Sequence, residues 1–137
     1  MDRIKKFFER DLYAKLSGIE LVDVKPGYAI AKMDIKEHHY NGVRIVHGGA
    51  IFTLADFAFA VASNTDDNVA VSIHSDIAIY KGISTGTLIA EAKEINKHPK
   101  LGSYQVEIKN EKGEMIALFN GIAYRKSEKK SLIPPSV

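Results

Sequence analysis

A single carboxylate stands inside an otherwise apolar stretch of the sequence. Between Ala50 and Ala62 the residues are Ala, Ile, Phe, Thr, Leu, Ala, Asp, Phe, Ala, Phe, Ala, Val and Ala, so Asp56 is the only charged one. Apolar side chains that lie all round a helix indicate a buried helix. A carboxylate in such surroundings is costly unless it has partners, and isolated buried carboxylates are concentrated in active sites. The alternative is a structural aspartate that caps a loop or pairs with a nearby lysine.

Two glycines, Gly48 and Gly49, open the same helix. Backbone N–H groups at a helix start can bind an anion or the oxyanion that develops on a carbonyl, although a turn that needs positive φ also explains a glycine pair. Gly49 precedes Asp56 by seven residues, which places both on one helix face but about 10 Å apart along the axis. One reacting carbon cannot lie about 3 Å from both groups. Cooperation between them therefore requires two chains with antiparallel helices, as in a two-fold dimer.

Histidines supply the next candidates. His47 lies directly before the glycines and is either a general base or a residue that shapes the loop entering the helix. The other four histidines lack the spacing of metal ligands, so we expect no metal site; they are His38, His39, His74 and His98. No serine lies in a nucleophile elbow and no phosphate-binding loop is present, so we expect no cofactor. The absence of cysteine excludes a disulfide scaffold, a thiolate zinc site and a cysteine nucleophile.

Length and composition limit the classes of protein. The 137 residues form one domain, 1–137, with 45% apolar and 26% charged residues, as in soluble globular proteins. A net charge of +2 argues against a nucleic-acid binder. No signal peptide or bilayer-spanning stretch is recognisable, so we expect a cytoplasmic protein that binds no membrane. A domain of this size with a long internal helix leaves apolar surface that a partner subunit can cover.

The remaining pattern predicts the elements that position these residues. Apolar residues at helical spacing predict an N-terminal surface helix over residues 1–17. Alternating patterns and turn signals predict strands at residues 19–24, 28–36, 69–80, 87–95, 103–110 and 115–124. Residues 126–137 are predicted to form a flexible tail. A single long helix among short-connected strands must be wrapped by the sheet, and the four final strands should form an antiparallel meander. The expected class is α+β, an antiparallel sheet wrapped around one central helix.

The run from Asn41 to Gly49, Asn-Gly-Val-Arg-Ile-Val-His-Gly-Gly, is followed by Leu54-Ala55-Asp56. Together these segments resemble the signature of PaaI-type hotdog thioesterases, relatives of the phenylacetyl-CoA and hydroxybenzoyl-CoA thioesterases. The similarity covers most of the chain in length and element order. It implies a hotdog fold, a homodimer or homotetramer with shared active sites, and hydrolysis of an acyl-CoA thioester to a free acid and CoA.

The resemblance also implies roles for individual residues. Asn41 and the Gly49 N–H would hold the thioester carbonyl, and Asp56 of the partner subunit would activate water or attack directly. Ser72, or the nearby Ser75, would place the water. Basic residues that meet the CoA phosphates would be Lys81, Lys97 and Lys100.

Two other functions fit the same fold. A hydratase or dehydratase would need a catalytic histidine paired with an acid in a different motif. A non-catalytic acyl-CoA-binding protein would keep the pocket but would not need Asp56. The identity of the acyl group depends on the depth of the pocket.

Overall fold

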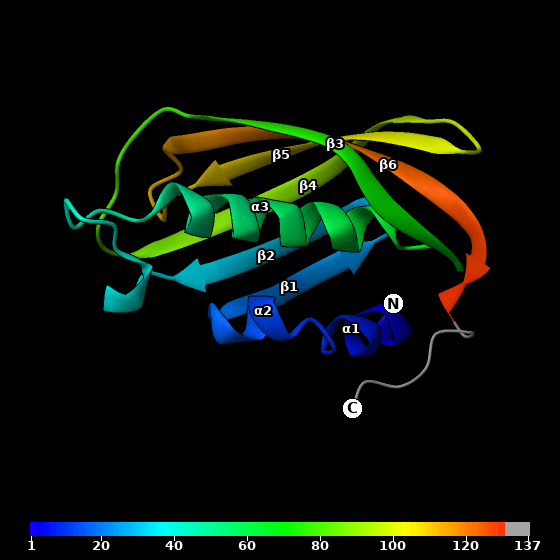
Figure 1. Cartoon of the computed structure of the whole chain (residues 1–137), viewed down its shortest axis with the longest axis horizontal. Helices are drawn as coiled ribbons and strands as arrows, with labels where there is room; N and C mark the ends of the chain where they lie inside the picture. Colours follow the sequence, from blue (N-terminus) through cyan, green and yellow to red (C-terminus); the bar gives the residue numbers. More distant parts are fainter. Residues whose placement is uncertain (131–137) are drawn as a thin grey trace.

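The computed structural model describes residues 1–130 and has the α+β architecture expected from the sequence. Six antiparallel strands form one sheet that curves around α3 (Gly48–Ser63), the helix that carries Asp56 (Figure 1). The sequence prediction of a long central helix over these residues is confirmed. A 3-10 turn, η1 (Glu37–His39), lies in the connection that leads into α3.

The order of the strands corrects one expectation. The strands are β1 (Ile19–Lys25), β2 (Tyr28–Asp34), β3 (Asn68–Ile79), β4 (Thr87–Lys97), β5 (Leu101–Lys109) and β6 (Met115–Lys129). Their spatial order is β1-β2-β4-β5-β6-β3. The prediction that β3 begins the final meander is therefore wrong, because β3 pairs with β6 and not with β4. The connection over residues 80–86 crosses the end of the sheet, which leaves β3 at the edge.

Small residues on the central strands let α3 lie close to the sheet. Ala29 and Ala31 of β2 pair with Ala92 and Ala90 of β4, and all four are fully buried. Because alanine adds little bulk above the backbone, this strip accepts a helix at short range. The α3 residues Leu54, Ala55 and Ala58 are fully buried in this packing.

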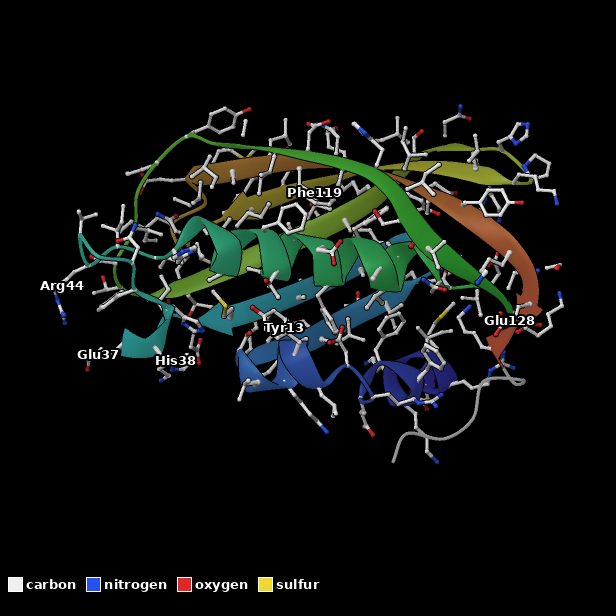
Figure 2. All side chains as sticks on the ribbon, viewed as in Figure 1. Tyr13, Glu37, His38, Arg44, Phe119 and Glu128 are labelled. Atoms are coloured by element: carbon white, nitrogen blue, oxygen red, sulfur yellow. The ribbon has the colours of Figure 1, made fainter. Side chains whose placement is uncertain are left out.

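Aromatic rings fill the space between α3 and the strands β5 and β6. The centroid of the Phe59 ring lies 5.5 Å from those of Tyr104 and Phe119, and Figure 2 shows Phe119 against the helix. Gly121 of β6 is needed here, since a Cβ at this position would lie 2.8 Å from Cζ of Phe59. The helix is therefore fixed in position along the sheet by ring packing and not by its polar groups.

One stripe of α3 remains at the surface of the single chain. Gly49 is exposed, and Thr53, Asp56 and Ala60 are half-buried. The sequence predicted a helix that is buried all round, and the structure corrects this. The four residues follow helical spacing along the side that the sheet does not cover. Two of the four residues on this stripe, Thr53 and Asp56, are polar, so the candidate carboxylate lies on the side of α3 that the sheet leaves uncovered.

The predicted N-terminal helix over residues 1–17 is two helices, α1 (Asp2–Phe8) and α2 (Leu12–Leu16). The break occurs because Asp11 caps the second helix, accepting a hydrogen bond from the Ala14 N–H at 3.0 Å. The ring of Phe8 packs edge-on against Phe57 of α3 at 5.9 Å between centroids. None of the helices within residues 1–130 is long and apolar enough to cross a membrane.

Residues 126–129 belong to β6, so the predicted flexible tail begins too early. The reason is a buried cluster at this end of the sheet. The Arg125 guanidinium donates to the His98 carbonyl at 2.8 Å and to the Tyr104 hydroxyl at 3.1 Å. Lys130 is also buried, and its ammonium donates to the carbonyl of Asn68 at 2.7 Å. The rest of the predicted tail, 131–137, lies outside the described residues.

Candidate active site

Asp56 lies halfway along α3 on the uncovered stripe. Its side chain makes no hydrogen bond or ion pair within residues 1–130. Burial raises the pKa of this carboxyl above its usual range, and the negative charge of Asp11 raises it further. Neither the loop cap nor the lysine pair considered for Asp56 is present among the described residues. An unpaired, partly desolvated carboxylate is suited to accept a proton or to attack a carbonyl carbon.

The proximity of Asp11 predicts a shift in the pH dependence of activity. In Asp11→Asn the loss of one negative charge should lower the pKa of Asp56, so the acid limb of the kcat/KM profile should move to lower pH. The sign follows because a base or nucleophile at Asp56, the role expected from the sequence, requires the ionised form, so activity should fall as pH drops through its pKa. Asparagine is as good a helix cap as aspartate, which keeps α2 in place. Asp2→Asn, at an exposed position of α1, removes the same charge elsewhere and is the matched control. If the acid limb of the kcat/KM profile lies at the same pH in both variants, the prediction is contradicted.

The start of α3 differs from the sequence expectation in one hydrogen bond. The Gly49 N–H is not free, because it donates to Nδ1 of the helix-capping residue His47 at 2.8 Å. The N–H groups of Ala50 and Ile51 donate to the His47 carbonyl at 2.9 and 3.3 Å. The N–H of Gly48 has no acceptor within residues 1–130. Gly48 therefore offers the unoccupied donor that the sequence assigned to Gly49, and His47 has a capping role that occupies Nδ1.

Asn41 closes a turn in the connection before α3 through its side-chain oxygen, while its side-chain amino group faces no partner within residues 1–130. Its Oδ1 accepts the N–H groups of Val43 and Ile45 at 3.0 and 3.3 Å, which closes a turn in which Arg44 has a φ of 62°. This is the turn-capping use that the residue type favours. The Nδ2 amino group has no partner among residues 1–130, so it remains available to a carbonyl oxygen. Turn formation fixes the asparagine and leaves its donor end free.

A buried histidine that the sequence did not single out holds this connection. His39 accepts the Lys36 N–H through Nδ1 at 2.9 Å, and its Nε2 lies 2.7 Å from the Ser17 carbonyl. Its own carbonyl accepts the His47 N–H at 2.7 Å. His39 thus ties the C-terminal end of α2 to the residue that caps α3. A signal for this role is absent from the sequence, because His38 and His39 are equivalent until the fold buries one of them.

The two candidate serines lie on the same side of β3. Ser75 pairs with Gly121, where a Cβ would point at Phe59 of α3, and Ser72 pairs with Ala123. Residues opposite one another in an antiparallel ladder point to the same face. Both serines therefore face the α3 side of the sheet, Ser75 half-buried and Ser72 exposed beside a bulge. The structure leaves both as candidates.

The three candidate lysines are not brought together. Lys81 follows β3 near the start of α3 and forms an ion pair with Glu114 at 2.6 Å. Lys97 and Lys100 lie at the β4–β5 turn, at the opposite end of the molecule (Figure 1), and Lys97 is 3.8 Å from Asp66. The intervening β4 has 11 residues, which span about 35 Å. Within one chain the three lysines therefore cannot contact one phosphate group together, and their contact with CoA stays a prediction.

Two cavities flank the connection that leads into α3. One, the α2–α3 groove, has a volume of about 380 Å³ and is lined by residues that include Tyr13, Leu16, Tyr40, His47, Gly49 and Thr53. The other, the Lys81 cleft, has a volume of about 340 Å³ and is lined by residues that include Lys81, Ile83, Ser84, Asn110 and Lys112. The Tyr40 hydroxyl donates to the Ser84 carbonyl at 2.7 Å. Tyr40 lines the groove and Ser84 lines the cleft, so this hydrogen bond lies between the two cavities.

Known proteins share both the sequence and the fold. A family model described as the thioesterase superfamily matches residues 44–117. A putative esterase of Archaeoglobus fulgidus is 38% identical over 130 residues, 93% of this chain and 84% of that protein. The acyl-coenzyme A thioesterase PaaI of Escherichia coli is 34% identical over 119 residues, 86% of this chain and 85% of that protein. The solved structure of E. coli PaaI, from the phenylacetic acid degradation operon, has a TM-score of 0.87 at 32% identity and covers 90% of this chain and 91% of that chain.

The fold and these matches define a hotdog-fold thioester hydrolase. The chain belongs to the thioesterase superfamily. The resemblance to PaaI-type proteins found in the Asn41–Asp56 signature is confirmed by the comparisons.

Proposed function

We propose that this enzyme hydrolyses acyl-CoA thioesters to a free acid and CoA, at a site shared by two copies of the chain. The observation that carries the proposal is that a carboxylate and two hydrogen-bond donors have no partner within residues 1–130. Within the part of the chain that the structure describes, Asp56 is an unpaired half-buried carboxylate, and its helix starts with the unused N–H of Gly48. The turn before this helix leaves Nδ2 of Asn41 without a partner among the same residues. E. coli PaaI, which is named as an acyl-CoA thioesterase, supports the choice of substrate class.

The carbonyl oxygen of the thioester is held by the Gly48 N–H and by Nδ2 of Asn41. Negative charge develops on this oxygen when the carbonyl carbon is attacked. The N–H groups and dipole of a helix start stabilise that charge. The removal of one such donor typically costs about 10²–10³ in kcat. His47 contributes indirectly, because its ring caps Gly49 and its carbonyl anchors the first turn of α3.

Asp56 of the partner subunit supplies the base or nucleophile. As a base it takes a proton from water, the water oxygen bonds to the carbonyl carbon, and the C–S bond breaks as the leaving thiolate of CoA takes that proton from Asp56. As a nucleophile its carboxylate oxygen bonds to the carbonyl carbon and the C–S bond breaks with release of CoA; water then hydrolyses the resulting anhydride to the free acid and regenerates the Asp56 carboxyl group. Ser72 or Ser75 places the water. Lys81, beside the Lys81 cleft, meets a phosphate of CoA, after exchanging its ion pair with Glu114.

Geometry supports the shared site. Asp56 is the eighth residue after Gly48, which places it about 12 Å farther along the axis. The N–H groups at a helix start also point away from the helix body, so the bound oxygen lies about 3 Å farther out. Edge strand β3 has one unpaired side and exposes Ile73 and Ile79. Pairing of this edge with its copy would continue the sheet and place two α3 helices antiparallel.

Thiol release from a panel of acyl-CoA thioesters tests the function. We expect release of CoA with a free acid as the second product, and no hydration of crotonyl-CoA in a parallel assay. Hydration without thiol release would identify a hydratase instead. Saturable acyl-CoA binding without either reaction would identify a non-catalytic binding protein.

Complementation tests the shared site separately. Asp56→Ala and Gly48→Pro should each give an inactive homodimer. In a mixed dimer one site combines intact Gly48 with intact Asp56, and the other site is doubly impaired. Random reassortment makes about half of the dimers mixed, so activity should return to roughly a quarter of wild type after co-refolding. Mixed dimers that form, as shown by a tagged pull-down, but stay inactive would place the whole site within one chain.

A further inference from the structure

The thioester carbon carries two substituents, and the structure offers two cavities for them. With the carbonyl oxygen at the start of α3, the acyl group and the CoA sulfur point in different directions from the same carbon. The α2–α3 groove and the Lys81 cleft are neighbours, because Tyr40, which lines the groove, donates to the carbonyl of Ser84, which lines the cleft. Each substituent of the bound thioester therefore has one adjoining cavity.

The chemistry of the two linings distinguishes them. The Lys81 cleft contains two lysines, Lys81 and Lys112, against one carboxylate, Glu111, so its lining is polar with a positive excess that suits phosphate oxygens. The α2–α3 groove has no lysine, arginine or carboxylate among its lining residues. Its lining does include three histidines, a serine and a threonine, but its α2 wall presents the large side chains of Tyr13 and Leu16. An apolar chain is therefore favoured in the groove and a phosphorylated one in the cleft.

The wall formed by α2 has two features of a binding surface. Tyr13 and Leu16 are three residues apart and thus neighbours on one helix face; they are 67% and 78% exposed, and Figure 2 shows Tyr13 on α2 at the side near α3. The helix itself is held at both ends. Asp11 caps its start, and buried His39 lies 2.7 Å from the Ser17 carbonyl at its end. Large apolar side chains on a fixed backbone are suited to contact an apolar ligand with little cost in ordering.

We propose that the α2–α3 groove binds the acyl group of the substrate, and that Tyr13 and Leu16 determine which acyl groups are accepted. The inference rests on the proposed thioesterase function and adds the part of the chain that sets specificity. Acetyl groups are too short to reach the α2 wall. Longer aliphatic or aryl acyl groups bury against it, so the enzyme should prefer them.

The test compares kcat/KM for acetyl-CoA, hexanoyl-CoA and phenylacetyl-CoA in wild type, Tyr13→Ala and Leu16→Ala. We expect each variant to lose about tenfold on the two larger substrates, because apolar contact with the acyl group is lost. Values for acetyl-CoA should stay within about twofold of wild type. Leu12→Ala is the matched control, since Leu12 lies on the same helix at 63% exposure but does not line the groove. Leu16→Trp, which narrows the groove, should exclude phenylacetyl-CoA and spare acetyl-CoA.

Failure of the proposed function and failure of this inference would give different results. A wild-type enzyme that hydrolyses none of the thioesters would end both the proposed function and this inference. An active wild type whose Tyr13 and Leu16 variants lose activity equally on all three substrates, or behave like Leu12→Ala, would overturn the inference alone. Thermal melting of each variant shows whether a uniform loss comes from unfolding, and in that case the selectivity of Leu16→Trp decides the outcome.

Discussion

Asp56→Asn should lower thioester hydrolysis by about 10²–10⁴-fold while the protein stays folded. The amide is nearly the same size as the carboxyl group but can neither accept a proton from water nor form an anhydride. The substitution fits the half-buried site on α3, where the carboxylate has no partner to lose within residues 1–130. The measurement is kcat for thiol release at the pH optimum of the wild type. Turnover close to wild type would remove Asp56 from the mechanism.

The stability of the same variant gives an internal control. Because burial raises the pKa of Asp56 in the folded state, the folded chain binds more protons than the unfolded chain in the window between the two pKa values. Stability of the wild type must therefore fall as pH rises through that window. The Asp56→Asn variant lacks this loss of stability with rising pH, so its melting temperature near neutral pH should be at least that of the wild type. An inactive variant that melts lower would instead indicate damage to the fold.

Gly48→Pro should lower kcat by about 10²–10³-fold, the effect expected when one oxyanion donor is removed. Proline deletes the N–H of Gly48 and little else. Gly48 is the first residue of α3, where proline is well tolerated. The preceding residue, His47, has φ −61° and ψ 137°, which is a conformation that proline permits in its neighbour.

Gly48→Ala is the matched control for the proline variant. It retains the N–H, and its Cβ would lie 3.4 Å from Cδ1 of Ile79, an ordinary contact. Alanine should therefore keep most of the activity that proline removes. The same comparison is not possible at Gly49, where a Cβ would lie 2.9 Å from Nδ1 of His47. If proline and alanine at Gly48 reduce kcat equally, the N–H is not the donor and steric crowding explains the loss.

Local patterns predicted the elements of this fold well. The apolar run around Asp56 predicted α3, and alternating patterns with turn signals predicted the six strands, because both depend on neighbours in sequence. The place of β3 was not predictable in the same way. Its pattern is equally compatible with β4 or β6 as a neighbour, and the choice depends on packing among distant segments.

The site was predictable in residue type but not in hydrogen bonding. The sequence placed Asp56 and a glycine N–H on one helix, and both are present. The sequence did not show that the His47 ring accepts the Gly49 N–H, because this hydrogen bond depends on a side-chain conformation. The role of Gly49 stays a prediction. The effect of Asp11 on Asp56 was missed for a related reason. It arises only when the N-terminal segment breaks into two helices and α2 lies beside α3.

The pairing of β3 with β6 constrains the order in which this protein can assemble. Residues 68–79 leave the ribosome directly after α3, yet the strand with which they pair in the described part of the chain, β6, ends at residue 129. During synthesis β1, β2 and α3 can associate early, while β3 waits as an unpaired apolar edge for the last part of the chain. Contacts between segments so distant in sequence form slowly, and an unpaired edge invites association with other chains. The strand that carries both candidate serines is therefore the part of the nascent protein most in need of protection by chaperones.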